Sequence, residues 1–329
     1  MILFVVTAHP AAGQDAEALP TTAELYQRAK RATVEVLVDG RLSGSGWFAD
    51  PEGLVMTAAH VIRRRSARFE VLSPTSGRLP AKPVAVDFGH DLGLLRVEPR
   101  EGGYPALPLA GEPPPPGEEI YLLGTPVFRH AVLLRGMVAR DGPAFEYYAD
   151  LHHYVEVMHV AATVQHGTSG GPWFNRRGQV IGLQSGVMPV GNSVYTGIAY
   201  AAPLEAIRSL LESGRTTATP TIGSSVEEIW EQKPETLDRF PPGTEGLILR
   251  TLRDDGPVVR AGLKQWDLVT AADGQKVRLR DELLRIIRGK QPGQPLQLDV
   301  LKPDGAGARQ VTVRLGKLEV GWPETPAKD

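Results

Sequence analysis

The segment QHGTSGGPWFN, residues 165–175, holds a serine among glycines, and a serine in such a setting is a candidate nucleophile. A serine hydroxyl reacts at neutral pH only when a neighbouring base takes its proton, and a histidine imidazole is suited to this. The pattern Gly167-x-Ser169-x-Gly171 fits the nucleophile elbow of α/β-hydrolases, in which the histidine follows the serine along the chain. All eight histidines precede Ser169, so the sequence argues against that pattern.

The opposite order, histidine then aspartate then serine, can be met in this chain. His60 ends the stretch TAAH, and Asp91 lies in DFGHDLGLL directly before an apolar strand that would bury it. We expect His60 to be the general base, Asp91 to fix its tautomer and Ser169 to be the nucleophile. Other aspartates between the histidine and the serine are alternatives for the acid: Asp87, Asp141 and Asp150.

Short predicted strands separated by Gly, Pro and Asp must position these side chains. From Thr33 to about Ala202 they are TVEVLVDG, RFEVLSP, LGLLRVEP, EIYLLGTP, VEVMHV and QVIGLQSG. Alternating apolar residues with such turn spacing predict a sandwich or barrel. We interpret the proline-rich stretch 99–117 as a connector between two β-halves, and the apolar stripe in 203–214 predicts a helix.

A second unit follows the predicted helix and a short linker, RTTATPT. Its segments predict the order strand, strand, helix, strand, strand, in a small α+β domain of about 100 residues. They are GLILRTL, DLVTAADG, KVRLRDELLRIIRG, PLQLDVLKPDG and QVTVRLG.

The motifs GSGWF, TAAHV, DLGLL and GTSGGP occur in an order that resembles trypsin-like proteases of the HtrA/Deg family. The similarity continues through GQVIGLQSG and GIAYAAPLEAIRSLL, and the second unit resembles the PDZ domains that follow HtrA catalytic domains. The resemblance implies a mostly β fold, with a two-barrel chymotrypsin/trypsin-like protease domain followed by a small α+β PDZ domain. We expect a signal segment at 1–18, a protease domain at 19–215, a linker at 216–221, a PDZ domain at 222–320 and a tail at 321–329.

The resemblance also implies an activity. We expect a serine endopeptidase that hydrolyses unfolded or misfolded proteins through an acyl-enzyme, with the backbone N–H groups of Gly167 and Ser169 forming an oxyanion hole. Thr168 and His166 replace residues that are usual in the family, and His166 could alter how this loop is set. A catalytically silent scaffold that binds peptides through its PDZ domain is the main alternative, and an esterase is another.

Two further sites follow from the resemblance. We expect a substrate pocket with a preference for small or apolar side chains, formed by Gln184, Ser185, Ile198, Ala199 and Tyr200. The peptide-binding loop of the PDZ domain corresponds to Ile222, Gly223 and Ser224, for which an ordinary interdomain turn is the alternative, and Trp266 stands where a glycine is usual. HtrA relatives commonly form trimers through their amino-terminal segment, where Tyr26 is a candidate contact.

Composition excludes several other classes of function. The formal charge is only -2 and the basic residues are dispersed, apart from three consecutive arginines at 63–65, so we expect no nucleic-acid partner. The chain has no cysteine and therefore no disulfide. Histidines cluster with Glu156 at 152, 153, 159 and 166, but strand alternation places His159 and Glu156 on opposite faces, so we expect neither a metal nor a cofactor.

The amino terminus, MILFVVTAHPAAG, resembles the end of a secretory signal, although no Lys or Arg precedes its apolar run. We therefore expect a periplasmic or secreted protein, with a first buried strand of a cytoplasmic protein as the alternative. No stretch reaches the ~18 apolar residues of a membrane helix.

Overall fold

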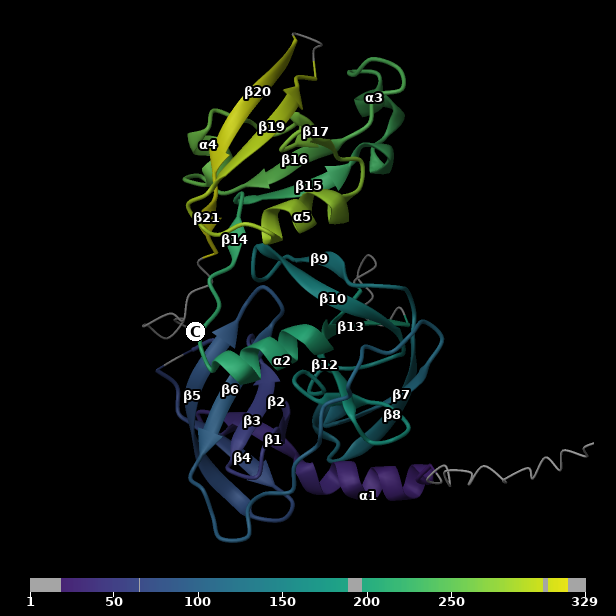
Figure 1. Ribbon diagram of the computed structural model, residues 1–329, viewed down its shortest axis with the longest axis vertical. Helices are drawn as coiled ribbons and strands as arrows, with labels where there is room; N and C mark the ends of the chain where they lie inside the picture. Colours follow the sequence, from purple (N-terminus) through teal and green to yellow (C-terminus); the bar gives the residue numbers. More distant parts are fainter. Residues whose placement is uncertain (1–18, 65, 189–196, 304–306, 319–329) are drawn as a thin grey trace, which may run out of the picture.

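The computed structural model describes residues 19–64, 66–188, 197–303 and 307–318, and Figure 1 shows two β-structured halves beneath a smaller domain. The mostly β fold expected from the sequence is confirmed. The predicted signal segment at 1–18 and the tail lie outside the described residues.

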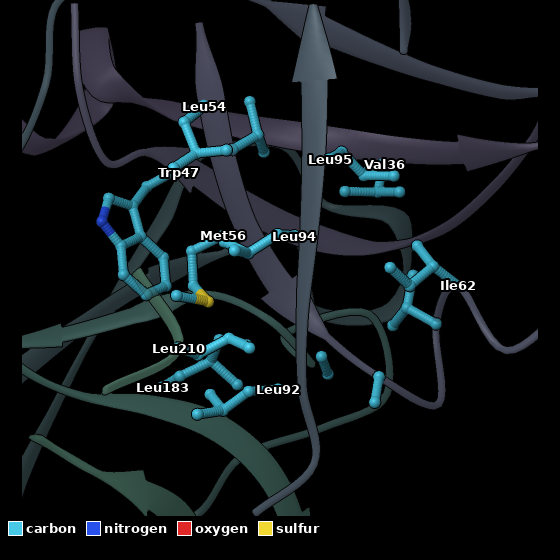
Figure 2. Packing of buried hydrophobic residues seen from close by; sticks show 14 of the residues in the cluster. Val36, Trp47, Leu54, Met56, Ile62, Leu92, Leu94, Leu95, Leu183 and Leu210 are labelled. Atoms are coloured by element: carbon cyan, nitrogen blue, oxygen red, sulfur yellow. The ribbon is translucent and has the colours of Figure 1, made fainter. Parts of the chain in front are cut away.

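The first half is a closed barrel of six antiparallel strands in the order β1-β2-β3-β6-β5-β4. These strands are β1 (Thr33–Val38), β2 (Arg41–Phe48), β3 (Leu54–Ala58), β4 (Phe69–Ser73), β5 (Gly77–Asp87) and β6 (Leu92–Val97). Alternate residues of β1 are buried, as expected of a barrel strand. Trp47, Met56 and Leu94 fill the interior with no exposed surface, so this core holds the ends of β3 and β6 in place (Figure 2).

The second half contains β7 (Glu119–Gly124), β8 (Val132–Val138), β9 (Ala144–Tyr148), β10 (His153–Ala161), β11 (Pro172–Phe174), β12 (Val180–Val187) and β13 (Ile198–Pro203). Its sheet runs β13-β12-β11-β7-β8-β10-β9, and an additional pairing of β10 with β13 closes a six-stranded ring. Strand β9 lies off this ring as the partner of β10 in a hairpin. The proline-rich connector lies between the halves and adds only an isolated bridge, Leu109 to Val180.

Two helices join these parts. The predicted helix is α2 (Leu204–Ser213), which ends at Gly214 in a left-handed conformation and buries Ile207 and Leu210 in the core cluster of the first barrel. The helix α1 (Thr22–Ala32) begins with a capping box between Thr21 and Glu24. Helix α1 is not among the elements predicted from the sequence, although the Thr and Glu of its capping box have the expected spacing there.

The second domain has a sheet in the order β15-β16-β17-β19-β20, with β18 beside β17. Its elements are β15 (Ser224–Glu228), β16 (Leu247–Leu252), β17 (Leu268–Ala272), β18 (Gln275–Lys276), α5 (Arg280–Arg288), β19 (Pro295–Leu301) and β20 (Ala308–Arg314). The short pair β14 (Pro220–Thr221) and β21 (Gly316–Lys317) lies at its base (Figure 1). The remaining helical turns are η1 (Pro126–Phe128), η2 (Ile229–Glu231), α3 (Pro234–Leu237) and α4 (Pro257–Arg260).

The hairpin of β9 and β10 packs against this second domain, beneath α5 in Figure 1. Phe145 and Tyr154 of the hairpin share a buried apolar cluster with Leu284 and Ile287 of α5. Asp281 of α5 accepts a hydrogen bond from the backbone N–H of Phe145 at 3.0 Å. The two domains therefore share part of a hydrophobic core and are not connected by the linker alone.

Candidate active site

His60 and Asp91 meet where two strands of the first barrel end. His60 follows β3 in a turn, and Asp91 immediately precedes β6, with φ of 55°. His60 Nδ1 lies 2.7 Å from Asp91 Oδ2, and the backbone N–H of His60 donates to Asp91 Oδ1 at 2.9 Å. The pairing of β3 with β6 sets this contact, because it brings Ala58 opposite Leu92.

The electrostatics of this pair favour an ionised aspartate beside a basic imidazole. Burial opposes both charges, but the attraction between the two groups and their hydrogen bond prevail. The pKa of His60 is therefore raised above its ordinary value, and the pKa of Asp91 is lowered. Asp91 is fully buried and also accepts a hydrogen bond from Ser185 Oγ at 2.5 Å. Its carboxylate thus has donors on both oxygens.

Ser169 lies in a loop that is hydrogen-bonded to strand β2 of the first barrel. The backbone N–H of Ser45 donates to Ser169 O at 2.7 Å, and Ser45 Oγ donates to Gly167 O at 2.8 Å. Gly170 has φ of 87°, and a side chain there would collide with Ser45 O. Only glycine allows the loop to approach β2 this closely.

Two backbone amides of this loop, those of Gly167 and Ser169, differ from the others, because the N–H groups of Thr168, Gly170 and Gly171 are all hydrogen-bonded. Within the described part of the chain, neither the N–H of Gly167 nor that of Ser169 donates to another group. The neighbouring carbonyl of His166 accepts from the N–H of Val127 at 2.7 Å, and it belongs to the peptide unit that carries the Gly167 N–H. In a trans peptide these two groups point in opposite directions, so holding the carbonyl orients the amide.

Ser169 is not hydrogen-bonded to His60 among the described residues; its Oγ donates instead to Ser185 O at 3.3 Å. His60 and Ser169 nevertheless line the same pocket. The two residues thus belong to one site without the hydrogen bond that a serine nucleophile makes to its base. Such hydrogen bonds are often absent before substrate binds.

A cavity of about 520 Å³ opens beside Ser169. Three of the five residues predicted to form the pocket line it, namely Gln184, Ser185 and Tyr200. Ile198 and Ala199 do not; Ile198 packs with Val155 and Val157, and Ala199 is fully buried in the second barrel. The segment 147–151 forms a further wall of the cavity that was not predicted, because no sequence motif marks that end of the β9–β10 hairpin.

Two other histidines, His90 and His159, pair with carboxylates outside this pocket. His90 Nδ1 lies 2.8 Å from Asp87 and its Nε2 lies 3.3 Å from Glu156. His159 Nε2 lies 2.8 Å from Glu146 across the hairpin. Within the residues that the structure describes, no three His, Asp or Glu side chains converge on a common point as metal ligands.

The predicted peptide-binding loop follows β14, and its last residue, Ser224, is the first residue of β15. Ile222 is buried, and Gly223 has φ of 72°. The edge of β15 that follows is occupied by the hairpin: the N–H of Val226 donates to the hydroxyl of Tyr154 at 2.8 Å, and that hydroxyl donates to Val226 O at 2.9 Å. One tyrosine therefore takes the place that an added peptide strand would need at this position.

Comparison with known proteins identifies both domains. The family model for the trypsin-like peptidase domain matches residues 44–183, and the model for the PDZ domain matches residues 220–315. The first match contains His60, Asp91 and Ser169, and the second contains the loop at 222–224.

Relatives are similar over most of this chain. A putative serine protease HhoA from Synechocystis sp. is 28% identical over 272 residues, which cover 79% of this chain and 68% of the relative. A probable periplasmic serine endoprotease DegP-like from Halomonas elongata is 28% identical over 290 residues, covering 87% of this chain and 58% of the relative. The chain thus spans between about half and two thirds of these relatives' lengths.

Solved structures show the same fold. The HtrA-type protease AlgW with decapeptide has a TM-score of 0.64 at 21% sequence identity, covering 91% of this chain and 99% of that one. A serine endoprotease from Yersinia pestis has a TM-score of 0.61 at 20% identity. Among the described residues, no helix has the length and apolarity needed to cross a membrane. The two matched domains and their order give this chain the architecture of the HtrA/DegP-type trypsin-like serine proteases with a PDZ domain.

Proposed function

We propose that this protein is a serine endopeptidase in which His60, Asp91 and Ser169 form the catalytic triad. The observation that carries the proposal is the hydrogen bond between His60 and buried Asp91, together with the pocket that His60 shares with Ser169. Among the described residues, the N–H groups of Gly167 and Ser169 donate to no other group. In this mechanism Ser169 Oγ turns to His60 and attacks the substrate carbonyl while His60 takes its proton.

The oxyanion hole in this proposal consists of the backbone N–H groups of Gly167 and Ser169. They receive the negative charge that develops on the carbonyl oxygen, and each such donor is typically worth ~3 kcal/mol of transition-state stabilisation. His60 then gives its proton to the leaving amine, and water hydrolyses the acyl-enzyme by the same route.

The proposed substrates are unfolded or misfolded proteins in the periplasm or outside the cell, and the PDZ domain binds peptide termini. Relatives named as probable periplasmic serine endoproteases and the structure of the HtrA-type protease AlgW with decapeptide support this part of the proposal. A trimer formed through the amino-terminal segment is part of the same proposal. In this chain, however, Tyr26 OH donates to Ala131 O of its own second barrel at 3.1 Å.

Labelling with a fluorophosphonate probe tests the proposal. We expect the wild-type protein to be labelled at Ser169 and to cleave an unfolded protein faster than a simple ester, and Ser169→Ala to lose both reactions. Folded wild-type protein that is not labelled, even with peptides added for the PDZ domain, would support the silent scaffold instead. Hydrolysis of esters alone would support an esterase.

A further inference from the structure

Tyr148 connects the wall of the pocket to the carboxylate that holds His60. It is the last residue of β9 and lines the cavity beside Ser169. Its hydroxyl lies 2.8 Å from Ser185 Oγ, and Ser185 Oγ lies 2.5 Å from Asp91 Oδ2. Two hydroxyl groups therefore form a path from the pocket to Asp91.

The direction of these hydrogen bonds follows from the charge of Asp91. An ionised carboxylate can only accept, so Ser185 uses its one proton toward Asp91. Tyr148 must then donate to Ser185, and burial keeps the phenol protonated by raising its pKa well above the ordinary value. A donor that itself accepts a hydrogen bond becomes a stronger donor, so Tyr148 strengthens the bond from Ser185 to Asp91.

The ring of Tyr148 is held by aromatic stacking. It stacks on Tyr200 with centroids 6.1 Å apart, and Tyr200 stacks on His159 at 5.4 Å. A side chain at Gly186 would come within 2.7 Å of the Tyr148 hydroxyl, so glycine at this position leaves room for the tyrosine. The ring therefore occupies a defined part of the pocket.

The polar groups of this wall are already engaged with one another. Gln184 accepts from the indole N–H of Trp173 at 2.9 Å and donates to Gly186 O at 2.7 Å. With the hydroxyls of Tyr148 and Ser185 also committed, the wall offers an entering side chain aromatic and aliphatic surface. Such a surface suits an apolar side chain of limited size.

We propose that Tyr148 positions Ser185 and Asp91 through its hydroxyl and, through its ring, limits the size of the apolar substrate side chain that the pocket accepts. The inference rests on the proposed peptidase function. Tyr148 is a positioning and specificity residue, because its hydroxyl acts on His60 only through Ser185 and Asp91.

The pKa of the His60 imidazole provides a test that needs no turnover. The charged or titratable groups that act on the pair are few: exposed Arg63 beside His60, and His153 of β10 facing Asp91. In Tyr148→Phe, Ser185 no longer accepts a hydrogen bond from residue 148, so its own hydrogen bond to Asp91 becomes weaker. The Asp91 carboxylate then keeps more of its negative charge, which stabilises the protonated form of His60. We expect the His60 pKa to rise by ~0.5 unit, a size typical of a lost indirect hydrogen bond.

NMR titration of the full chain measures this shift, in the Ser169→Ala background to prevent self-cleavage. The effect of Tyr148→Phe should vanish when Ser185→Ala is also present, because the path is then already broken. Tyr104→Phe is the matched control: it removes a phenol that donates to Glu98 O at 2.7 Å in the first barrel, away from the pocket. Equal His60 pKa values with and without the Tyr148 hydroxyl would overturn the positioning role.

Cleavage of a peptide series that varies the residue on the acyl side of the scissile bond tests the size limit. We expect Tyr148→Ala to raise the ratio of kcat/KM for Phe over Ala at that residue ~10-fold or more, and Tyr148→Phe to leave it unchanged. Tyr148→Leu, which keeps more of the packing, should raise the ratio less. An unchanged ratio in folded Tyr148→Ala and Tyr148→Leu would refute the size limit. A wild-type protein that hydrolyses no peptide would instead overturn the proposed function. The NMR titration would then still test whether Tyr148 acts on His60 through Ser185 and Asp91.

Discussion

At the scale of single residues, the ionic state of the His60–Asp91 pair decides what Ser169 can do. In the proposed mechanism, His60 must be neutral to take a proton, and Asp91 must be charged to hold the imidazole in the tautomer that leaves Nε2 free. The hydrogen bonds at 2.7 and 2.9 Å, with the donor from Ser185, provide that arrangement around a buried Asp91, while the His60 side chain stays partly exposed.

We predict that the reaction of Ser169 with a fluorophosphonate slows as the pH falls through the pKa of His60. Since Asp91 raises this pKa above 6.5, half of the maximal rate should be reached above pH 6.5. Labelling rates measured between pH 5 and 9 check this. A half-maximal rate clearly below pH 6.5 would show that His60 is not the group that titrates.

Asp91→Asn should lower kcat by about 10⁴-fold without unfolding the protein, because an amide can hold the imidazole in the wrong tautomer. Turnover of an unfolded protein substrate, together with a melting curve, measures both quantities. Asp141→Asn is a suitable control, since Asp141 is exposed and was an alternative acid by sequence. If both variants kept wild-type turnover, the assigned acid would be incorrect.

At the scale of elements, the turn that leads into Asp91 is held by a network of four charged groups. His90 lies between Asp87 and Glu156, and Arg288 of α5 donates to Tyr154 O at 2.7 Å and to Gly89 O at 3.5 Å. A side chain at Gly89 would collide with Arg288. The second domain thus helps to set a turn of the first barrel.

We predict that this network makes the stability of the protein depend on pH. Burial lowers the pKa of His90, but Asp87 and Glu156 outweigh it and raise this pKa to about 9, against 6.5 in the unfolded chain. The stabilisation is therefore fully present below pH 6.5 and is lost as the pH rises through 9. The full shift corresponds to about 3 kcal/mol, and the partial exposure of the imidazole reduces the expected loss to about 1–2 kcal/mol.

Urea unfolding of Ser169→Ala protein at pH values from 6 to 9.5 measures this loss. His90→Gln should remove the decline, since glutamine does not titrate. His152→Asn changes an exposed histidine at a positive φ that asparagine tolerates, and it should keep the decline. The same slope in His90→Gln as in the parent protein would contradict the prediction.

At the scale of the whole molecule, the β9–β10 hairpin serves both domains. Its Tyr148 reaches the pocket, while its Phe145 and Tyr154 pack into the core of the second domain. Since Tyr154 occupies both backbone groups of Val226, a peptide that adds a strand to β15 must displace the hairpin locally.

We therefore predict that Tyr154→Ala raises the affinity of the PDZ domain for peptides with a free carboxyl terminus by ~10-fold or more, because the competing contact is removed. Fluorescence anisotropy with a labelled apolar peptide measures the affinity, and the amidated peptide should bind neither protein. Tyr147→Phe is the control, because its hydroxyl makes no hydrogen bond among the described residues. Equal peptide affinity in Tyr154→Ala and wild type would show that β15 is not the binding edge.

Much of the architecture could be predicted from local patterns. Strand alternation, the stripe of α2 and the glycines around Ser169 each depend on residues close together in the chain, and the predicted strands and helix are present within a few residues. Strand β15 was missed because SSVEE is short, polar and without a turn signal, and its pairing with β16 alone makes it a strand.

The sequence by itself determined the two-domain architecture, and it selected His60, Asp91 and Ser169 as candidates from their order and their motifs. Only the tertiary structure decided which atoms meet: Asp91 rather than Asp87 beside His60, Tyr148 on Ser185, and Tyr154 on the edge of β15. The physical reason is that a sequence motif reflects what the local backbone requires, such as a glycine at position 170, where a side chain would collide with Ser45 O. Hydrogen bonds between residues 37 or 72 positions apart depend on how strands register and how domains pack, which no single segment encodes.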